Sequence, residues 1–149
     1  MIKSVNLRAT GIPWLLLGVW LGGGCTGSAV MQSLQPVVQL EMQGSVEGNA
    51  DQTPRVTATT SESAVVTGVI STPNPCYTFD AGIAVADETL VMTITANSRG
   101  GMCAAVVGSF TYRATIGGLS PGSFPVRIVH TYPGTGWEDR TFELRLLIS

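Results

Sequence analysis

Apolar and polar residues alternate along much of the chain, and the pattern is clearest between Cys76 and Cys103. Two alternating runs lie there, separated by Asp87-Glu88. A period of two residues is typical of half-buried β-strands. The stretch therefore predicts two consecutive strands joined by a polar turn, with a cysteine at each outer end. The apolar members are Tyr77, Phe79, Ala81, Ile83 and Val85, then Leu90, Met92, Ile94 and Ala96.

Similar alternation predicts further strands on both sides of this pair. Residues 55–60 have little apolar content and predict a short edge strand. Seven or eight short strands without a convincing amphipathic helix favour an all-β fold, a single β-sandwich of antiparallel strands over residues 37–149. The additional strands are predicted at residues 38–42, 55–60, 64–71, 110–116, 124–130 and 142–148.

Charge is sparse and unevenly placed in this chain. Charged residues make up 12% of it, and from Glu41 onward it holds six Arg, no Lys and ten acidic residues, so the formal net charge there is 6 − 10 = −4. Proteins that bind nucleic acid usually present a basic patch. Nucleic acid is therefore not an expected partner.

The first 24 residues read as an export signal. Lys3 and Arg8 precede an apolar run of about ten residues, 12–21, and three glycines follow. A transmembrane helix needs about twenty apolar residues, so this run is too short to span a bilayer. We expect a removable signal peptide rather than a membrane span.

The end of this segment resembles the signal peptides of bacterial lipoproteins. In that family a Leu, one or two small residues and a Cys form the lipobox, and the cysteine is acylated and becomes the first mature residue. Here glycines precede Cys25, and Leu21 stands one place further from it than in the family pattern. The resemblance implies a signal peptide over 1–24, lipidation of Cys25 and a tether over 25–36.

The same resemblance implies a location in a bacterial cell envelope, with a lipid anchor in the membrane. Thr26 follows the cysteine, and the absence of Asp at this place implies the outer membrane in a Gram-negative cell. The alternative is an ordinary secretory signal cleaved near Ala29, which would give a secreted protein.

Three cysteines are present, at positions 25, 76 and 103. An exported chain with an odd number of cysteines leaves one thiol unpaired, and acylation of Cys25 would remove that thiol. Cys76 and Cys103 lie at the two ends of the predicted strand pair, so we expect a disulfide between them. A redox pair is the alternative, but the Cys-x-x-Cys spacing that tunes thiol acidity is missing.

Residues 117–128, GGLSPGSFPVRI, resemble the corner between strands E and F of fibronectin type III and immunoglobulin-like domains. In those domains a Leu, a Pro-Gly turn and an aromatic residue lead into an apolar strand. The resemblance implies an immunoglobulin-like sandwich. Phe124 stands where the family has a tyrosine whose hydroxyl bonds nearby backbone, and Phe cannot donate that bond. Pro125 predicts a sheet edge or a bulge at the start of this strand.

Few residues offer catalytic or metal-binding chemistry. His130 is the only histidine, and its position in a predicted strand favours a structural role. Asp80, Asp87 and Glu88 lack the regular spacing of a calcium loop, so a solvated turn is the better interpretation for them. We therefore expect no enzyme, no catalytic residue, no metal and no cofactor.

The loop between the last two predicted strands is the candidate binding site. It contains Tyr132, Trp137, Glu138 and Asp139 around Pro-Gly-Thr-Gly. Tyr and Trp provide binding area at low entropic cost. The alternative is that the two rings face each other and cover the end of the core.

These observations favour a membrane-anchored, non-catalytic envelope lipoprotein that acts as a binding or structural module. Its partner would be an envelope protein or a glycan. A small secreted or surface inhibitor of a protease or similar macromolecule is the alternative, because immunoglobulin-like scaffolds also present inhibitory loops; fold analogy alone supports it.

Overall fold

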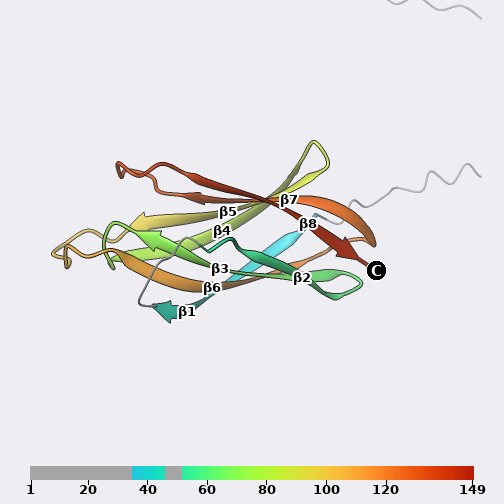
Figure 1. Ribbon diagram of the computed structural model, residues 1–149, viewed down its shortest axis with the longest axis horizontal. Coiled ribbons are helices and arrows are strands. Elements are labelled where there is room, and N and C mark those ends of the chain that lie inside the picture. Colours follow the sequence, from blue (N-terminus) through green and yellow to red (C-terminus); the bar gives the residue numbers. More distant parts are fainter. Residues whose placement is uncertain (1–34, 46–51) are drawn as a thin grey trace, which may run out of the picture. The chain divides into compact units, whose positions relative to one another are not determined.

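A computed structural model describes residues 35–45 and 52–149, all within the compact unit Gln32–Ser149. Figure 1 draws the other residues as a grey trace. The predicted signal peptide 1–24, the lipidation residue Cys25 and most of the tether 25–36 lie outside the described residues.

The described residues form eight strands and no helix. Each predicted strand is found, and the short strand predicted at residues 55–60 has those bounds. The strands are β1 Val37–Ser45, β2 Arg55–Thr60, β3 Ser63–Thr72, β4 Tyr77–Ala86, β5 Thr89–Ser98, β6 Gly108–Gly117, β7 Gly122–Thr131 and β8 Arg140–Ile148.

The strands form two four-stranded sheets, with the orders β1-β6-β3-β2 and β4-β5-β7-β8. Figure 1 shows the two sheets as layers. Buried side chains from both sheets form one hydrophobic cluster, including Met92 and Ile94 of β5 and Ala114 and Ile116 of β6. The predicted all-β sandwich is therefore confirmed.

The prediction that all strands are antiparallel is wrong at one pair: β5 and β7 pair in parallel, from Leu90↔Val126 to Thr95↔Thr131. The cause lies in the connection between them. After β5 the chain crosses to the other sheet, runs back as β6 and returns to start β7 at the end where β5 also starts. A parallel pair needs such a crossover connection.

The alternation in the sequence correctly predicts which side chains face the core. In β5, Leu90, Met92, Ile94 and Ala96 are all buried, and the residues between them are less so. The same holds for Val126, Ile128 and His130 of β7. Val85 at the end of β4 departs from the pattern, since it is 61% exposed.

The glycine at the centre of β3 has a packing role. Gly68 pairs with Tyr112 of β6, and the tyrosine ring lies over it. A Cβ atom added at Gly68 would lie 2.5 Å from the Tyr112 hydroxyl oxygen. Tyr112 is fully buried, and its ring occupies the space that a side chain at position 68 would need.

Pro125 lies near the start of β7, an inner strand of its sheet. Residues Gly122 to Pro125 pair with β8, but the pairing with β5 begins only at Val126. The start of β7 therefore has a strand neighbour on one side only. The edge predicted from Pro125 is confirmed locally, although β7 as a whole is not an edge strand.

Candidate functional site

The predicted loop Tyr132–Asp139 joins β7 to β8 and is held together by its own polar groups. The backbone N–H of Tyr132 donates to Asp139 Oδ1 at 3.2 Å, and the Thr135 hydroxyl donates to the Tyr132 carbonyl at 2.9 Å. The Trp137 N–H donates to Thr135 Oγ1 at 3.1 Å. These bonds give the glycine-containing loop a defined shape.

The two aromatic rings of this loop contact each other edge to face, with centroids 5.6 Å apart. Tyr132 is buried, at 3% exposure, whereas Trp137 is half-buried and packs against the core. The interpretation that the rings cover the end of the core is therefore correct for Tyr132. Only part of Trp137, with the exposed Glu138 and Asp139, remains available to a partner, and binding by this loop stays a prediction.

Burial and a neighbouring carboxylate both act on Tyr132. Its pKa is raised to about 12, first because burial disfavours the phenolate and second because Asp139 repels it. Tyr132 is therefore a neutral phenol at physiological pH. Its ring packs in the hydrophobic core and against Trp137.

His130 lies in the core, 1% exposed. Its Nε2 and the Tyr112 hydroxyl are hydrogen-bonded at 3.1 Å, and its ring contacts Phe142 at 5.2 Å. Burial lowers the pKa of His130 to about 4 and raises that of Tyr112. The neutral imidazole thus joins the two sheets through a polar contact inside the core, the structural role predicted for it.

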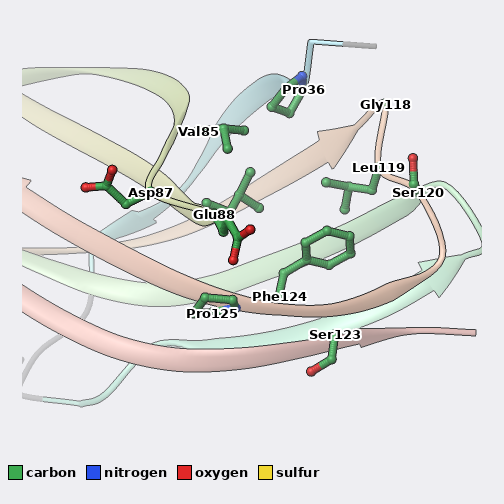
Figure 2. A pocket seen from close by; sticks show the side chains of 11 residues that line it. Pro36, Val85, Asp87, Glu88, Gly118, Leu119, Ser120, Ser123, Phe124 and Pro125 are labelled. Carbon is green, nitrogen blue, oxygen red and sulfur yellow. The ribbon is translucent and has the colours of Figure 1, made fainter. Parts of the chain in front are cut away.

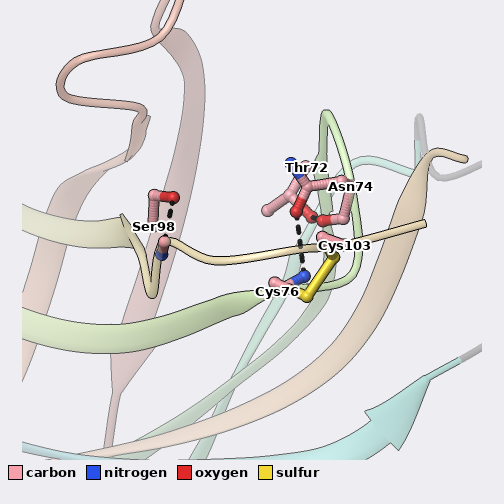
Figure 3. Close-up of a disulfide and its surroundings, with 6 residues drawn as sticks. Thr72, Asn74, Cys76, Ser98 and Cys103 are labelled. Carbon is pink, nitrogen blue, oxygen red and sulfur yellow. Dashed lines mark hydrogen bonds between the residues drawn. A yellow bond between two sulfur atoms is a disulfide. The ribbon is translucent and has the colours of Figure 1, made fainter. Parts of the chain in front are cut away.

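The predicted disulfide between Cys76 and Cys103 is confirmed, with Cα atoms 6.1 Å apart (Figure 3). The turn before Cys76 is set by Asn74, whose Oδ1 accepts the Cys76 N–H at 3.0 Å, and by Thr72, whose hydroxyl donates to the Asn74 carbonyl at 2.6 Å. The bridge ties this turn to the loop between β5 and β6. That loop exposes three large apolar side chains, Met102, Val106 and Val107.

The acidic residues considered for calcium do not converge. Asp80 Oδ2 accepts a 2.8 Å hydrogen bond from Asn97 Nδ2 on β5, while Asp87 and Glu88 form the β4–β5 turn. Both turn residues are exposed and have positive φ, 47° and 62°. Within residues 35–45 and 52–149, no three His, Cys, Asp or Glu side chains are grouped so that they could hold a metal ion.

A hollow that the sequence did not predict lies beside this turn (Figure 2). Its volume is about 520 Å³. We call it the corner pocket, because the β6–β7 corner forms one wall and the β4–β5 turn another. Its lining consists of Pro36, Val85, Asp87, Glu88, Leu90, Gly118, Leu119, Ser120, Ser123, Phe124 and Pro125.

The chain enters β1 beside the corner pocket. Gly118 has φ of +76°, and a Cβ there would lie 3.1 Å from the Gln35 carbonyl oxygen. Glycine at this position therefore allows the positive φ of the turn and leaves room for residues 35–36 to pass close to it. Residues 35–36 therefore enter β1 at the end of the sandwich that carries the pocket, while the disulfide and the loop Tyr132–Asp139, called the Trp137 loop below, lie at the other end (Figure 1).

Two signals in the sequence point to the corner pocket in retrospect. Asp-Glu occupies a two-residue hairpin turn in which Asn-Gly is the favoured pair. Pro125, which has no backbone N–H to donate, lies in the first part of β7, where β5 does not pair with it. Neither signal shows that Leu90, Leu119 and Phe124, distant from one another in the sequence, line one cavity.

The fold and the sites define an all-β protein of two four-stranded sheets with one parallel strand pair. Comparisons with protein families, curated proteins and solved structures found no significant match. No helix suitable for spanning a membrane occurs in the part of the chain that the structure describes.

Proposed function

We propose that this chain is a lipid-anchored, non-catalytic binding module of a bacterial cell envelope, placed in the outer membrane if the cell is Gram-negative. The disulfide carries the proposal. Two of the three cysteines are joined to each other, so no cysteine in the chain remains as a partner for Cys25. Structural disulfides are typical of exported proteins, and acylation would give the third cysteine a function.

The absence of a catalytic role is part of this proposal. His130, the sole histidine, is buried and bonded to Tyr112, so a catalytic triad would lack an accessible imidazole. The corner pocket and the exposed part of the Trp137 loop are the surfaces proposed for binding. We propose a relation to immunoglobulin-like domains on one feature only. The β6–β7 corner crosses between the sheets, as the corner between strands E and F does in those domains.

Replacement of Cys25 tests the anchor. In cells grown with an alkyne-labelled fatty acid, we expect the wild-type protein in the membrane fraction and labelled. The Cys25→Ser protein should carry no label, because serine offers no thiol for acylation. It should also be missing, as mature protein, from the membrane fraction. Ser33→Ala, in the same tether, serves as the matched control and should behave as wild type.

The alternative signal gives a different result in the same experiment. An unlabelled, soluble wild-type protein whose mature N-terminus lies near Ala29 would overturn the lipoprotein proposal. The mass of the mature protein distinguishes the two cases directly.

A further inference from the structure

The corner pocket has an apolar interior. Leu90 and Leu119, which line it, are only 3% and 5% exposed. The half-buried Phe124 ring lies beside Leu119, and Figure 2 shows Asp87 and Glu88 on the opposite side. A volume of about 520 Å³ falls within the range of about 300–1,000 Å³ that is usual for ligand sites. The pocket is therefore large enough to accept a bulky apolar group.

The charged groups of the pocket are all negative. Asp87 and Glu88 are its only ionisable lining residues, and the lining contains no Lys, Arg or His. A ligand with a cation next to its apolar group would find two carboxylates there. An anionic ligand would be repelled.

The pocket also borders a stretch of unpaired strand. Over Gly122–Pro125, β7 has β8 on one side and no strand on the other within the described residues. The backbone groups on that free side can pair with an added extended segment. Addition of a peptide strand to an open sheet edge is a common mode of recognition, in which pockets select alternate side chains.

We propose that the corner pocket binds an extended peptide segment of another envelope protein, in which a bulky apolar residue stands next to a lysine or arginine. The segment lies along Gly122–Pro125, its apolar side chain enters between Leu119 and Phe124, and its cation faces Asp87 and Glu88. This inference rests on the proposed binding function and names the class of partner.

The experiment uses the full mature protein, in nanodiscs if it is acylated and in buffer if it is not, and a set of short fluorescent peptides. The central pair of each peptide combines Leu, Ile, Phe or Trp with Lys, Arg or Glu. Fluorescence anisotropy should show binding of Lys and Arg peptides, with the matching Glu peptides weaker by about fivefold or more, as expected for two exposed carboxylates. Empty nanodiscs correct for adsorption to lipid.

Variants of the protein locate the binding. The double variant Asp87→Asn, Glu88→Gln should remove the preference for Lys and Arg, whereas Glu41→Gln, at an exposed carboxylate on β1 outside the pocket lining, should keep it. Ser123→Trp places a large side chain on the exposed rim and should abolish binding of every peptide. Melting temperatures of all three variants confirm that the fold is retained.

Several outcomes would overturn the proposal. Equal affinity for Lys and Glu peptides, no binding by any peptide, or binding unchanged in the double variant each contradict it. Binding of octylamine without binding of peptides would assign the pocket to small cationic amphiphiles instead. Fatty-acid labelling of the same preparation separates the two proposals. Acylated protein that binds no peptide contradicts only the peptide-binding proposal. Unacylated protein that binds peptide contradicts only the proposal of a lipid anchor.

Discussion

Tyr112 reaches across the core from β6 to His130 on β7, and its ring also covers Gly68 on β3. One side chain thus connects two strands of its own sheet and one strand of the other. Every buried side-chain polar atom among the described residues has a hydrogen-bond partner. A change at any of these three positions therefore disturbs packing and a buried polar contact together.

We predict that Gly68→Ala destabilises the protein by about 1–3 kcal/mol, the usual cost of overpacking. The new methyl group would lie 2.5 Å from the Tyr112 oxygen, and the ring must move away from His130. Urea unfolding measures the change. Gly82→Ala on β4 is the matched control, since a Cβ there meets nothing within 4 Å; equal stability of the two variants would contradict the packing argument.

The burial of His130 predicts a loss of stability in acid. Its pKa is about 4 in the folded protein and near 6.5 in an unfolded chain. Between these values the unfolded chain binds a proton that the folded protein does not. The free energy of unfolding therefore falls as the pH drops from about 6.5 to about 4, by roughly 3 kcal/mol, and this contribution is fully present above pH 6.5.

The variant His130→Gln isolates this contribution, because glutamine can hydrogen-bond but does not titrate in this range. Urea unfolding at several pH values should show a smaller acid-induced loss in the variant than in wild type. Parallel pH profiles for the two proteins would show that His130 is protonated equally in both states, contrary to the prediction.

At the scale of single elements, the β4–β5 turn contains the two non-glycine residues with positive φ in the part of the chain that the structure describes, Asp87 and Glu88. Residues other than Gly, Asn and Asp adopt this conformation at a cost in free energy, so Glu88 is the less favourable of the two. Replacing the pair by Asn-Gly should stabilise the protein by about 1 kcal/mol, as measured by thermal unfolding. Thr59→Ala, at the exposed end of β2, is the control and should not raise the stability. If the Asn-Gly variant is less stable than wild type, the claim that the Asp87-Glu88 turn is strained is wrong.

The disulfide acts on two connections at once, since it links the turn before β4 to the loop after β5. Cys76 and Cys103 are 27 positions apart, and for a loop of this size the chain-entropy argument gives about 3.5 kcal/mol. The double variant Cys76→Ser, Cys103→Ser should therefore unfold at a clearly lower urea concentration than wild type. Reductant should shift wild type toward the variant and leave the variant unchanged; coincident curves without reductant would show that the bridge adds nothing.

Strand positions were predictable because each strand has one face toward the core. In β6, for example, Tyr112, Ala114 and Ile116 are buried and Arg113 between them is exposed. Pairing partners were not predictable in the same way. Whether Leu90 faces Val126 or a residue of another strand depends on how the chain crosses between sheets, and no local pattern records that choice.

At the scale of the whole molecule, the two ends of the sandwich differ in character. One end carries the disulfide, the Trp137 loop and the exposed Met102, Val106 and Val107. The other carries the corner pocket and the start of β1 at Pro36. The aromatic loop was identified from composition alone, whereas the pocket was missed because its walls come from distant parts of the sequence and its carboxylates were interpreted as a solvated turn.

The crossing path of the chain also sets the order in which the protein can fold. Among the described strands, β1 pairs only with β6, β3 pairs with β2 and β6, and β5 pairs with β4 and β7. When the chain is synthesised from its N-terminus, five strands precede β6. Until β6 is present, only the hairpins β2–β3 and β4–β5 can form. Contacts between distant residues form slowly, because the loop entropy must be lost before they stabilise anything. We therefore expect the complete sandwich to form only once its last three strands are present.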